Sequence, residues 1–289
     1  MKTWRRINWP IMPPLIAVAC LLVFPLMIVL SLSTRQVAPG QVGGIVGGYQ
    51  LTLDNYLTFF HPAYLRYVTD TLWLSLIATT IAVLAAYPVA YWLAVAPSSW
   101  RRRLTIVALI VVLYASAVVK VYGVSIALGP MGLRGSIAEF WGVGMNNRLV
   151  TSTVVVVGLI NFLTPIATLM MVAPFQQISP SLSAAAQSLG ANRLTAHLTV
   201  IIPLCRAGIS QVFMLVYAAS VSAFVIPLVL GRGQVAFLSN LVYARFSEVA
   251  DFPGGAALSI LLLLITLCVT LGLGWIVGNP AAKWRGYRS

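Results

Sequence analysis

Long runs of apolar residues, separated by short groups of charged residues, divide the chain into six windows. Each window is long enough to cross about 30 Å of hydrocarbon as a helix that rises about 1.5 Å per residue. The pattern therefore predicts six transmembrane helices, near residues 10–33, 70–95, 104–128, 149–173, 207–230 and 256–278. The uncharged stretch after Arg148 is longer than one span needs, and its surplus forms a separate segment near residues 179–203.

The composition is that of a membrane protein. Of the 289 residues, 60% are hydrophobic and only 8% are charged, which is too few charges for the surface of a soluble protein of this size. No long polar block interrupts the windows, so we predict a single all-α membrane domain over residues 1–289. The uncharged run from Ile7 to Thr34 is too long for a cleaved signal peptide, and we expect it to be retained as the first span.

The distribution of basic residues predicts the orientation. In a soluble protein a net charge of +13 would favour a nucleic-acid partner, but in a membrane protein Lys and Arg gather in cytoplasmic loops. With the amino terminus inside, eleven basic residues fall on the cytoplasmic side and six on the outer side. We therefore expect both termini in the cytoplasm, contact with membrane lipid and no nucleic-acid partner.

The chain shows no pattern typical of a metal site or of an enzyme. Cys20, Cys205 and Cys268 lie far apart in sequence, and His61 and His197 are isolated, so we expect neither a disulfide nor a metal site. A G-x-x-x-x-G-K-[ST] phosphate loop is absent from the sequence. We therefore expect the chain to have no ATPase activity or other catalytic activity of its own.

The segment at 179–203 has the pattern of a short amphipathic helix followed by a turn. Ser179 and Pro180 form a helix start, with a hydroxyl cap followed by Pro at the first helical position. Gly190 is expected to end this helix in the left-handed conformation. Four apolar residues share one helical face between these points: Leu182, Ala185, Ala186 and Leu189.

A second short helix is predicted over residues 193–202. Asn192 is placed to cap it, and Pro203 is expected to limit it before the fifth span. With both termini inside, this helix–turn–helix faces the cytoplasm. The periodicity alone fits equally well an amphipathic loop that lies on the membrane surface.

The same segment resembles the cytoplasmic coupling loop of ATP-binding-cassette (ABC) importer permeases. The motif of that family is Glu-Ala-Ala, three residues, Gly, nine residues, then Ile-x-Leu-Pro. This chain has Ala-Ala-Ala from position 184, then Gly190, and Val200, Ile202 and Pro203 at the same spacing, so Ala184 replaces the Glu. The resemblance implies a loop that docks on an ATPase, with these contact residues: Ala184, Ala185, Ala186, Leu189, Gly190, Ala191 and Pro203.

Three further stretches, at 51–94, 118–123 and 224–246, resemble the spermidine/putrescine subfamily of these permeases. The resemblance implies a type I ABC importer permease fold in the bacterial cytoplasmic (inner) membrane. It also implies a second, similar permease, an extracytoplasmic solute-binding protein, and two separate ATPase subunits that use ATP and Mg²⁺. The expected solute is a polyamine or a related small organic molecule, and this chain itself is expected to bind no cofactor.

Polar and aromatic residues near the middle of the spans are the candidates for the solute path. Asn161 lies near the centre of the fourth span, and Ser220 lies near the centre of the fifth. The alternative is packing, because such groups commonly form hydrogen bonds between spans; we weight the two interpretations equally for Asn161 and favour packing for the serine. Lys120 falls near the outer edge of its span, which favours a structural role. The path candidates are Tyr122, Asn161, Thr164, Tyr217, Ser220 and Phe224.

The main alternative function is a secondary transporter or a channel that is not coupled to ATP. Such proteins usually have ionisable residues at the midplane and broken inverted repeats, and this sequence shows neither clearly. A membrane-embedded enzyme fits less well, because no His/Asp/Glu or Ser/His cluster is present.

Overall fold

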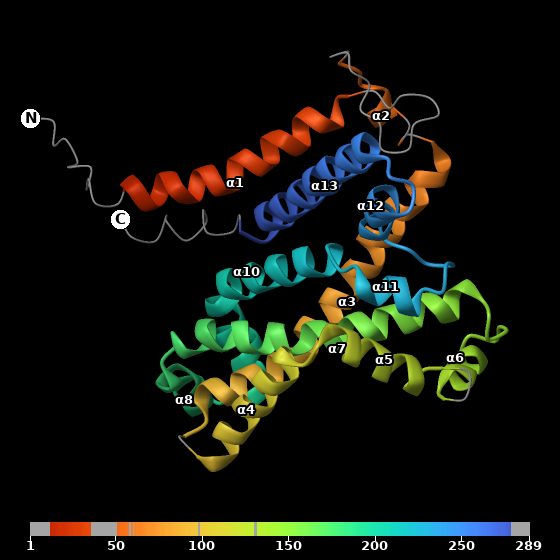
Figure 1. Ribbon diagram of the computed structural model, residues 1–289. Helices are drawn as coiled ribbons and strands as arrows, with labels where there is room; N and C mark the ends of the chain where they lie inside the picture. Colours follow the sequence, from red (N-terminus) through yellow and green to blue (C-terminus); the bar gives the residue numbers. More distant parts are fainter. Residues whose placement is uncertain are drawn as a thin grey trace, which may run out of the picture. The chain divides into compact units, whose positions relative to one another are not determined.

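The computed structural model describes residues 12–35, 51–57, 59, 61–97, 99–129 and 132–278 (Figure 1). These residues form helices joined by turns, with one isolated β-bridge between Arg35 and Leu51 in this part of the chain. The predicted all-α fold is confirmed. The residues before 12, at 36–50 and after 278, which carry part of the predicted orientation, lie outside the described residues.

Contacts divide the chain into two units, residues 1–64 with 241–263 and residues 65–240 with 264–289. The division into units does not test the single domain expected from the sequence, which stays a prediction. In the first unit α1 (Met12–Ser33) is followed by the short helix α2 (Asp54–Leu57). The Asn55 amide donates to the carbonyl oxygens of Ser33 and Arg35, both at 2.9 Å, and thereby holds α2 against the end of α1.

The first unit also contains the junction between α12 (Leu238–Ser247) and α13 (Phe252–Gly278), helices that both extend into the second unit. One Asp251 carboxylate oxygen accepts from the Gly254 amide at 2.9 Å, as an N-cap does, and the other pairs with Arg245 at 2.8 Å. A single side chain therefore fixes the turn between the two helices.

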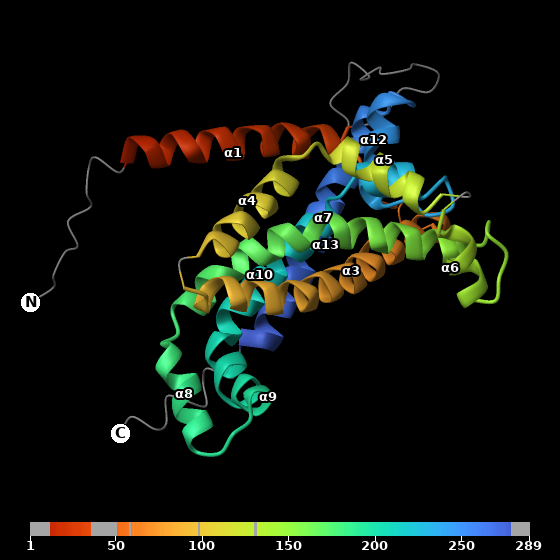
Figure 2. The same ribbon diagram turned by 90° about the horizontal axis from the view of Figure 1, so that it is seen from below.

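The second unit is built around α7 (Arg148–Gln176), which packs against several neighbours (Figures 1 and 2). Its neighbours are α4 (Trp100–Tyr114), α5 (Ala117–Ala127), α6 (Arg134–Phe140), α10 (Ile202–Val221) and α11 (Val225–Leu230). One hydrophobic core joins α7 and α10 to α3 (Pro62–Val95). The buried face of α3 is lined by small side chains at 0% exposure, which let its neighbours approach closely: Ala78, Ala82, Ala86 and Ala90.

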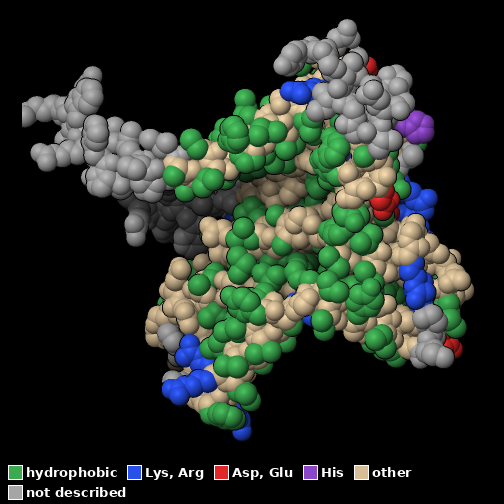
Figure 3. Space-filling model, viewed as in Figure 1, with side chains coloured by type: hydrophobic (Ala, Val, Ile, Leu, Met, Phe, Trp, Pro, Cys, Tyr) green, Lys and Arg blue, Asp and Glu red, His purple; other side chains and the backbone are tan. Residues whose placement is uncertain are grey.

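The molecule is a multi-pass membrane protein by the length and hydropathy of its helices. The described residues contain four helices long and apolar enough to span a membrane, or five when α4 and α5 count as one span. A further apolar stretch at Ala17–Ser33 in α1 is shorter. Large hydrophobic side chains remain exposed, such as Val111 at 62% and Leu215 at 55%, and Figure 3 shows hydrophobic side chains spread over the face drawn, with few charged ones. Such a surface suits lipid. The count of six spans stays a prediction.

The predicted span at 104–128 is not one straight helix, because α4 and α5 meet at an angle of 94°. The backbone is extended at Ala115 and Ser116, with ψ of 135° and 132°. Lys120 closes the break: its Nζ donates to the Val112 carbonyl at 3.0 Å and lies 4.9 Å from the centre of the Phe162 ring. The cation therefore satisfies an end carbonyl of α4 and fastens the break to α7.

The predicted span at 207–230 is also interrupted, between the end of α10 at Val221 and the start of α11 at Val225. The carbonyl oxygen of Ala223 accepts from the Ser239 hydroxyl at 2.8 Å. The carbonyl oxygen of Phe224 accepts from the Asn240 amide at 2.9 Å. Ser239 supplies the Ala223 carbonyl with a donor that a continuous helix could not, because residue 227 is a proline without an amide hydrogen. The Phe224 carbonyl accepts from Asn240 in addition to the Leu228 amide of its own helix, at 3.2 Å.

Candidate functional site

The helix–turn predicted at 179–190 is formed by α8 (Pro180–Ser188) and its C-terminal cap. Gly190 has φ of +89°, so the left-handed conformation predicted there is confirmed. Its amide donates to the Gln187 carbonyl at 3.0 Å, and the Ala191 amide donates to the Ala186 carbonyl at 3.1 Å. These two bonds are the Schellman pattern, which closes a helix end without outside partners.

At the other end of α8, Pro180 occupies the first turn as predicted. The prediction that the Ser179 hydroxyl caps the helix is wrong, because this hydroxyl makes no cap bond and instead lies 2.6 Å from the Ser181 hydroxyl. The predicted cap at Asn192 is confirmed, since its Oδ1 accepts from the Thr195 amide at 2.7 Å. This second cap opens α9 (Arg193–Ala196).

Pro203 does not end the second helix, and that prediction is wrong. From α9 the chain continues through a π-turn, η3 (His197–Ile201), directly into α10. The Ile202 amide donates to the His197 carbonyl, five residues back. Pro203 then falls in the first turn of α10. The wider π-turn accommodates the proline ring, and the missing amide hydrogen of proline does not interrupt the helix there. The helix therefore runs on from Leu194 to Val221.

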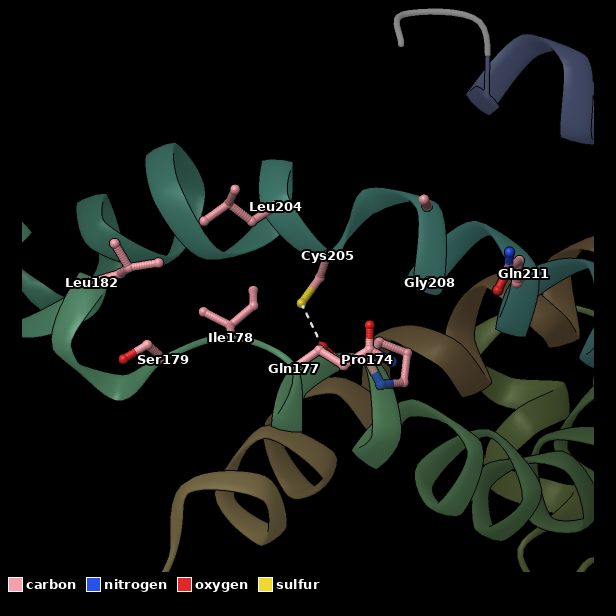
Figure 4. Close-up of a pocket in the computed structure, with 10 residues that line it drawn as sticks. Pro174, Gln177, Ile178, Ser179, Leu182, Leu204, Cys205, Gly208 and Gln211 are labelled. Atoms are coloured by element: carbon pink, nitrogen blue, oxygen red, sulfur yellow. Dashed lines mark hydrogen bonds between the residues drawn. The ribbon is translucent and has the colours of Figure 1, made fainter.

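Where this segment joins the spans, a pocket of about 590 Å³ lies between the end of α7 and the start of α10 (Figure 4). Pro174, Ser179 and Leu182 line one side, and Leu204 and Gly208 line the other. The buried Cys205 thiol bridges the two helices by donating to the Pro174 carbonyl at 3.5 Å. The two helices are therefore in contact at Cys205 and leave a cavity beside it.

The predicted docking residues form an open surface on α8 and its cap. Ala185, Gly190 and Pro203 are exposed, and Leu189 is 90% exposed. Ala186 and Ala191 are half-buried, and the side chain of Ala184 lies outside the described residues. The sequence has no acidic residue between positions 177 and 206, so this surface offers no carboxylate for an ionic contact.

The structure does not bring the predicted path residues together on one surface. Asn161 is exposed, and Tyr122 is 56% exposed. Tyr217 and Ser220 instead are buried inside the second unit at 1% and 0%, although the Ser220 hydroxyl has no hydrogen-bond partner there. Their burial favours packing over contact with a solute.

Two further path candidates lie between these extremes. Thr164 is half-buried, and its hydroxyl donates to the Ile160 carbonyl of its own helix at 2.7 Å. Phe224 is half-buried at the break between α10 and α11. Asn161 and Tyr122 are thus the candidates most open to a solute or a partner chain.

A buried polar network around α6 was not predicted from the sequence. Arg134 is 2% exposed, and its guanidinium donates to the Met145 carbonyl and to the Thr151 hydroxyl, both at 2.9 Å. The Thr151 hydroxyl in turn donates to Gln234 at 2.8 Å. Burial, and to a lesser extent the nearby Arg232, lower the pKa of Arg134 from its ordinary value. These contacts join residues far apart in sequence, so no local pattern signals them.

An ion pair between Arg148 and Asp70 ties the start of α7 to α3 and was likewise not predicted. Among the described residues, no group of three His, Cys, Asp or Glu side chains is arranged to hold a metal ion.

Comparison with known proteins gives permease proteins of transport systems as sequence relatives. The chain is 29% identical over 239 residues to the spermidine/putrescine transport system permease protein PotB of Escherichia coli (strain K12), covering 82% of this chain and 83% of that protein. It is 28% identical over 224 residues to PotB of Haemophilus influenzae, covering 76% and 78%. No protein-family model matches the chain.

Solved structures show the same fold. A bacterial ABC transporter involved in the import of alginate superposes with a TM-score of 0.70 at 16% identity, over 94% of each chain. The alginate transporter in complex with a pentasaccharide-bound periplasmic protein gives 0.69 at 16% identity, over 92% of each. The chain has the fold of ABC importer permeases, and the resemblance to spermidine/putrescine permeases expected from its sequence is confirmed.

Proposed function

We propose that this chain is the transmembrane permease subunit of an ATP-driven, binding-protein-dependent importer in a bacterial inner membrane. The observation that carries the proposal is the exposed helix–turn–helix at 180–202, closed by its own caps at Gly190 and Asn192. The resemblance of its sequence to the coupling-loop motif of ABC importer permeases supports the proposal. Similarity to PotB over 82% of the chain supports the same conclusion.

The proposed assembly has a second permease of similar fold, two ATPase subunits and an extracytoplasmic solute-binding protein. The sequence lacks a phosphate loop, so ATP and Mg²⁺ act in the partner ATPase. The alginate transporter of similar fold was solved together with a periplasmic protein, which supports a binding protein here. Docking on cytoplasmic ATPases requires α8 to face the cytoplasm, in agreement with both termini lying inside.

The proposed solute is a polyamine or a related small organic molecule, which is supported by the similarity to spermidine/putrescine permeases of two bacteria. The Asp70 carboxylate of α3 is already paired with Arg148, so it offers little to a passing ammonium group. Aromatic faces can hold such a cation instead, and the exposed ring of Tyr122 is suited to this role.

The proposal is tested with the assembled transporter in proteoliposomes, by measuring ATPase co-purification, solute-stimulated hydrolysis and spermidine uptake. We expect uptake to require ATP and the ATPase. Gly190→Val should remain in the membrane but lower ATPase association, or uncouple hydrolysis from uptake, by about tenfold. A branched side chain at φ of +89° is strained by roughly 1 kcal/mol or more, and it would project from the docking surface.

Gly142→Val is the matched control. Gly142 also has a positive φ, +63°, and a Cβ added there would meet no atom within 4 Å, but the residue lies far from α8 in sequence. Equal losses in both variants would mean general destabilisation instead of a docking defect. Spermidine uptake by the wild-type protein without any ATPase would contradict the proposed function and favour a secondary transporter.

A further inference from the structure

A cluster of aromatic rings joins the segment at 180–202, here called the coupling segment, to α3 and α7 of the second unit. The His197 Nδ1 of η3 lies 3.1 Å from the Tyr87 hydroxyl of α3. The His197 ring meets the Tyr91 ring of the same helix edge to face, with ring centres 4.4 Å apart. Phe175 of α7 lies edge-on to both tyrosines, at 5.2 and 5.6 Å. The histidine is thus held by α3 directly and by α7 through the tyrosines.

The π-turn sets the direction in which His197 points. Within η3, Ile201 is 2% exposed and His197 is half-buried, whereas Leu198 and Thr199 are exposed. A π-turn is rare and is found often at functional sites. Here it aims one ring of the coupling segment at the spans while the helix continues through Pro203.

The contacts of α8 lead to the spans through η3. The principal contacts of α8 are with α9 and η3. At the root of α8, the cavity of about 590 Å³ separates Ser179 and Leu182 from Leu204 and Gly208 (Figure 4). A displacement of α8 therefore reaches the close-packed rings through η3.

We propose that His197 is a positioning residue that transmits movement of the ATPase-docking segment to α3 and α7 through the Tyr87–Tyr91–Phe175 cluster. The inference rests on the proposed function, because it assumes that an ATPase moves α8. It adds to that function a specific mechanical contact, which is separate from the docking surface formed by Leu189 and Gly190.

The test uses the assembled transporter in proteoliposomes and compares spermidine taken up per ATP hydrolysed. His197→Ala should keep ATPase co-purification and ATP hydrolysis near wild type, while uptake per ATP falls by about tenfold. Tyr87→Phe, which removes only the hydrogen-bonded hydroxyl, should lower uptake per ATP by about threefold. His197→Asn keeps a polar group near the position of Nδ1 and should recover part of the loss. Tyr67→Phe, on the same helix but outside the cluster, is the control and should change nothing.

A second readout follows the root of the segment directly. In a Cys20→Ser/Cys268→Ser background, the buried Cys205 should react with a maleimide at a rate that changes when ATP is added. His197→Ala should reduce that change, because the segment would keep its continuity with α10 but lose the contact of His197 with α3.

The proposal is overturned if His197→Ala keeps wild-type uptake per ATP, or if association, hydrolysis and uptake fall together as in a purely structural defect. A wild-type protein that shows no ATP-dependent uptake would overturn the proposed function as well, and that failure is recognised because it precedes any substitution.

Discussion

Gly208 sets how closely α10 approaches α7. A Cβ at this position would lie 2.5 Å from Cβ and 2.6 Å from Cγ of Pro174, and a proline ring cannot rotate away. We expect Gly208→Ala to lower the free energy of unfolding by about 1–3 kcal/mol through overpacking. The measurement is the thermal unfolding midpoint of the full chain in detergent.

Gly123→Ala provides the control, because Gly123 lies inside α5 with nothing within 4 Å of its would-be Cβ. This variant should be more stable by about 0.5–1 kcal/mol, since alanine loses less conformational entropy in a helix. Equal midpoints for the two variants would show that α7 and α10 separate easily, contrary to the close contact described.

At the scale of helices, the break between α4 and α5 depends on one cation. Lys120→Met removes the hydrogen bond to the Val112 carbonyl and the contact with the Phe162 ring, and it leaves an end carbonyl of α4 without that donor. We expect the 94° angle to become variable. Spin labels at the exposed Val107 and Ile126 would report this as a broadened distance distribution.

Lys120→Arg retains a donor and a positive charge, so it should keep the narrow distribution. If Lys120→Met is as narrow as the parent, the extended backbone at Ala115 and Ser116 holds the angle without help from the lysine.

At the scale of the whole molecule, the basic residues predict which side each connection faces. Eleven of them lie on the side assigned to the cytoplasm and six on the outer side. Single cysteines replacing Glu139 in α6 and Gln187 in α8, in a background without the native cysteines, should react with an impermeant maleimide from opposite sides. We expect Glu139→Cys to react in intact spheroplasts and Gln187→Cys only in inverted vesicles. Reaction of both from one side would disprove the orientation.

Features decided by near neighbours were predictable from the sequence. The left-handed Gly190 and the Asn192 cap depend on residues within five positions, and both were predicted correctly. The two helix breaks were not predicted. One uses Phe162, forty-two residues beyond Lys120, and the other uses side chains from α12 that lie 16 residues beyond the carbonyls they satisfy.

The burial of Tyr217 and Ser220 could not be predicted from the sequence for a different reason. In a membrane both faces of a helix are apolar, so hydropathy does not say which face of α10 meets the protein and which meets lipid. Packing against the rest of the protein decides it, and both residues are buried. The same ambiguity explains why Asn161, equally central in its span, lies exposed.

The break between α10 and α11 constrains how the chain enters the membrane during synthesis. The carbonyl groups of Ala223 and Phe224 are satisfied by Ser239 and Asn240, which leave the ribosome later. Until then the Phe224 carbonyl has the Leu228 amide, but the Ala223 carbonyl would be unpaired in hydrocarbon, at a cost of several kcal/mol, because Pro227 has no amide hydrogen to donate. Residues 222–224 must therefore keep contact with water or with the translocation channel until α12 has been made. Release of this part of the protein into lipid thus waits for a segment that is not itself a span.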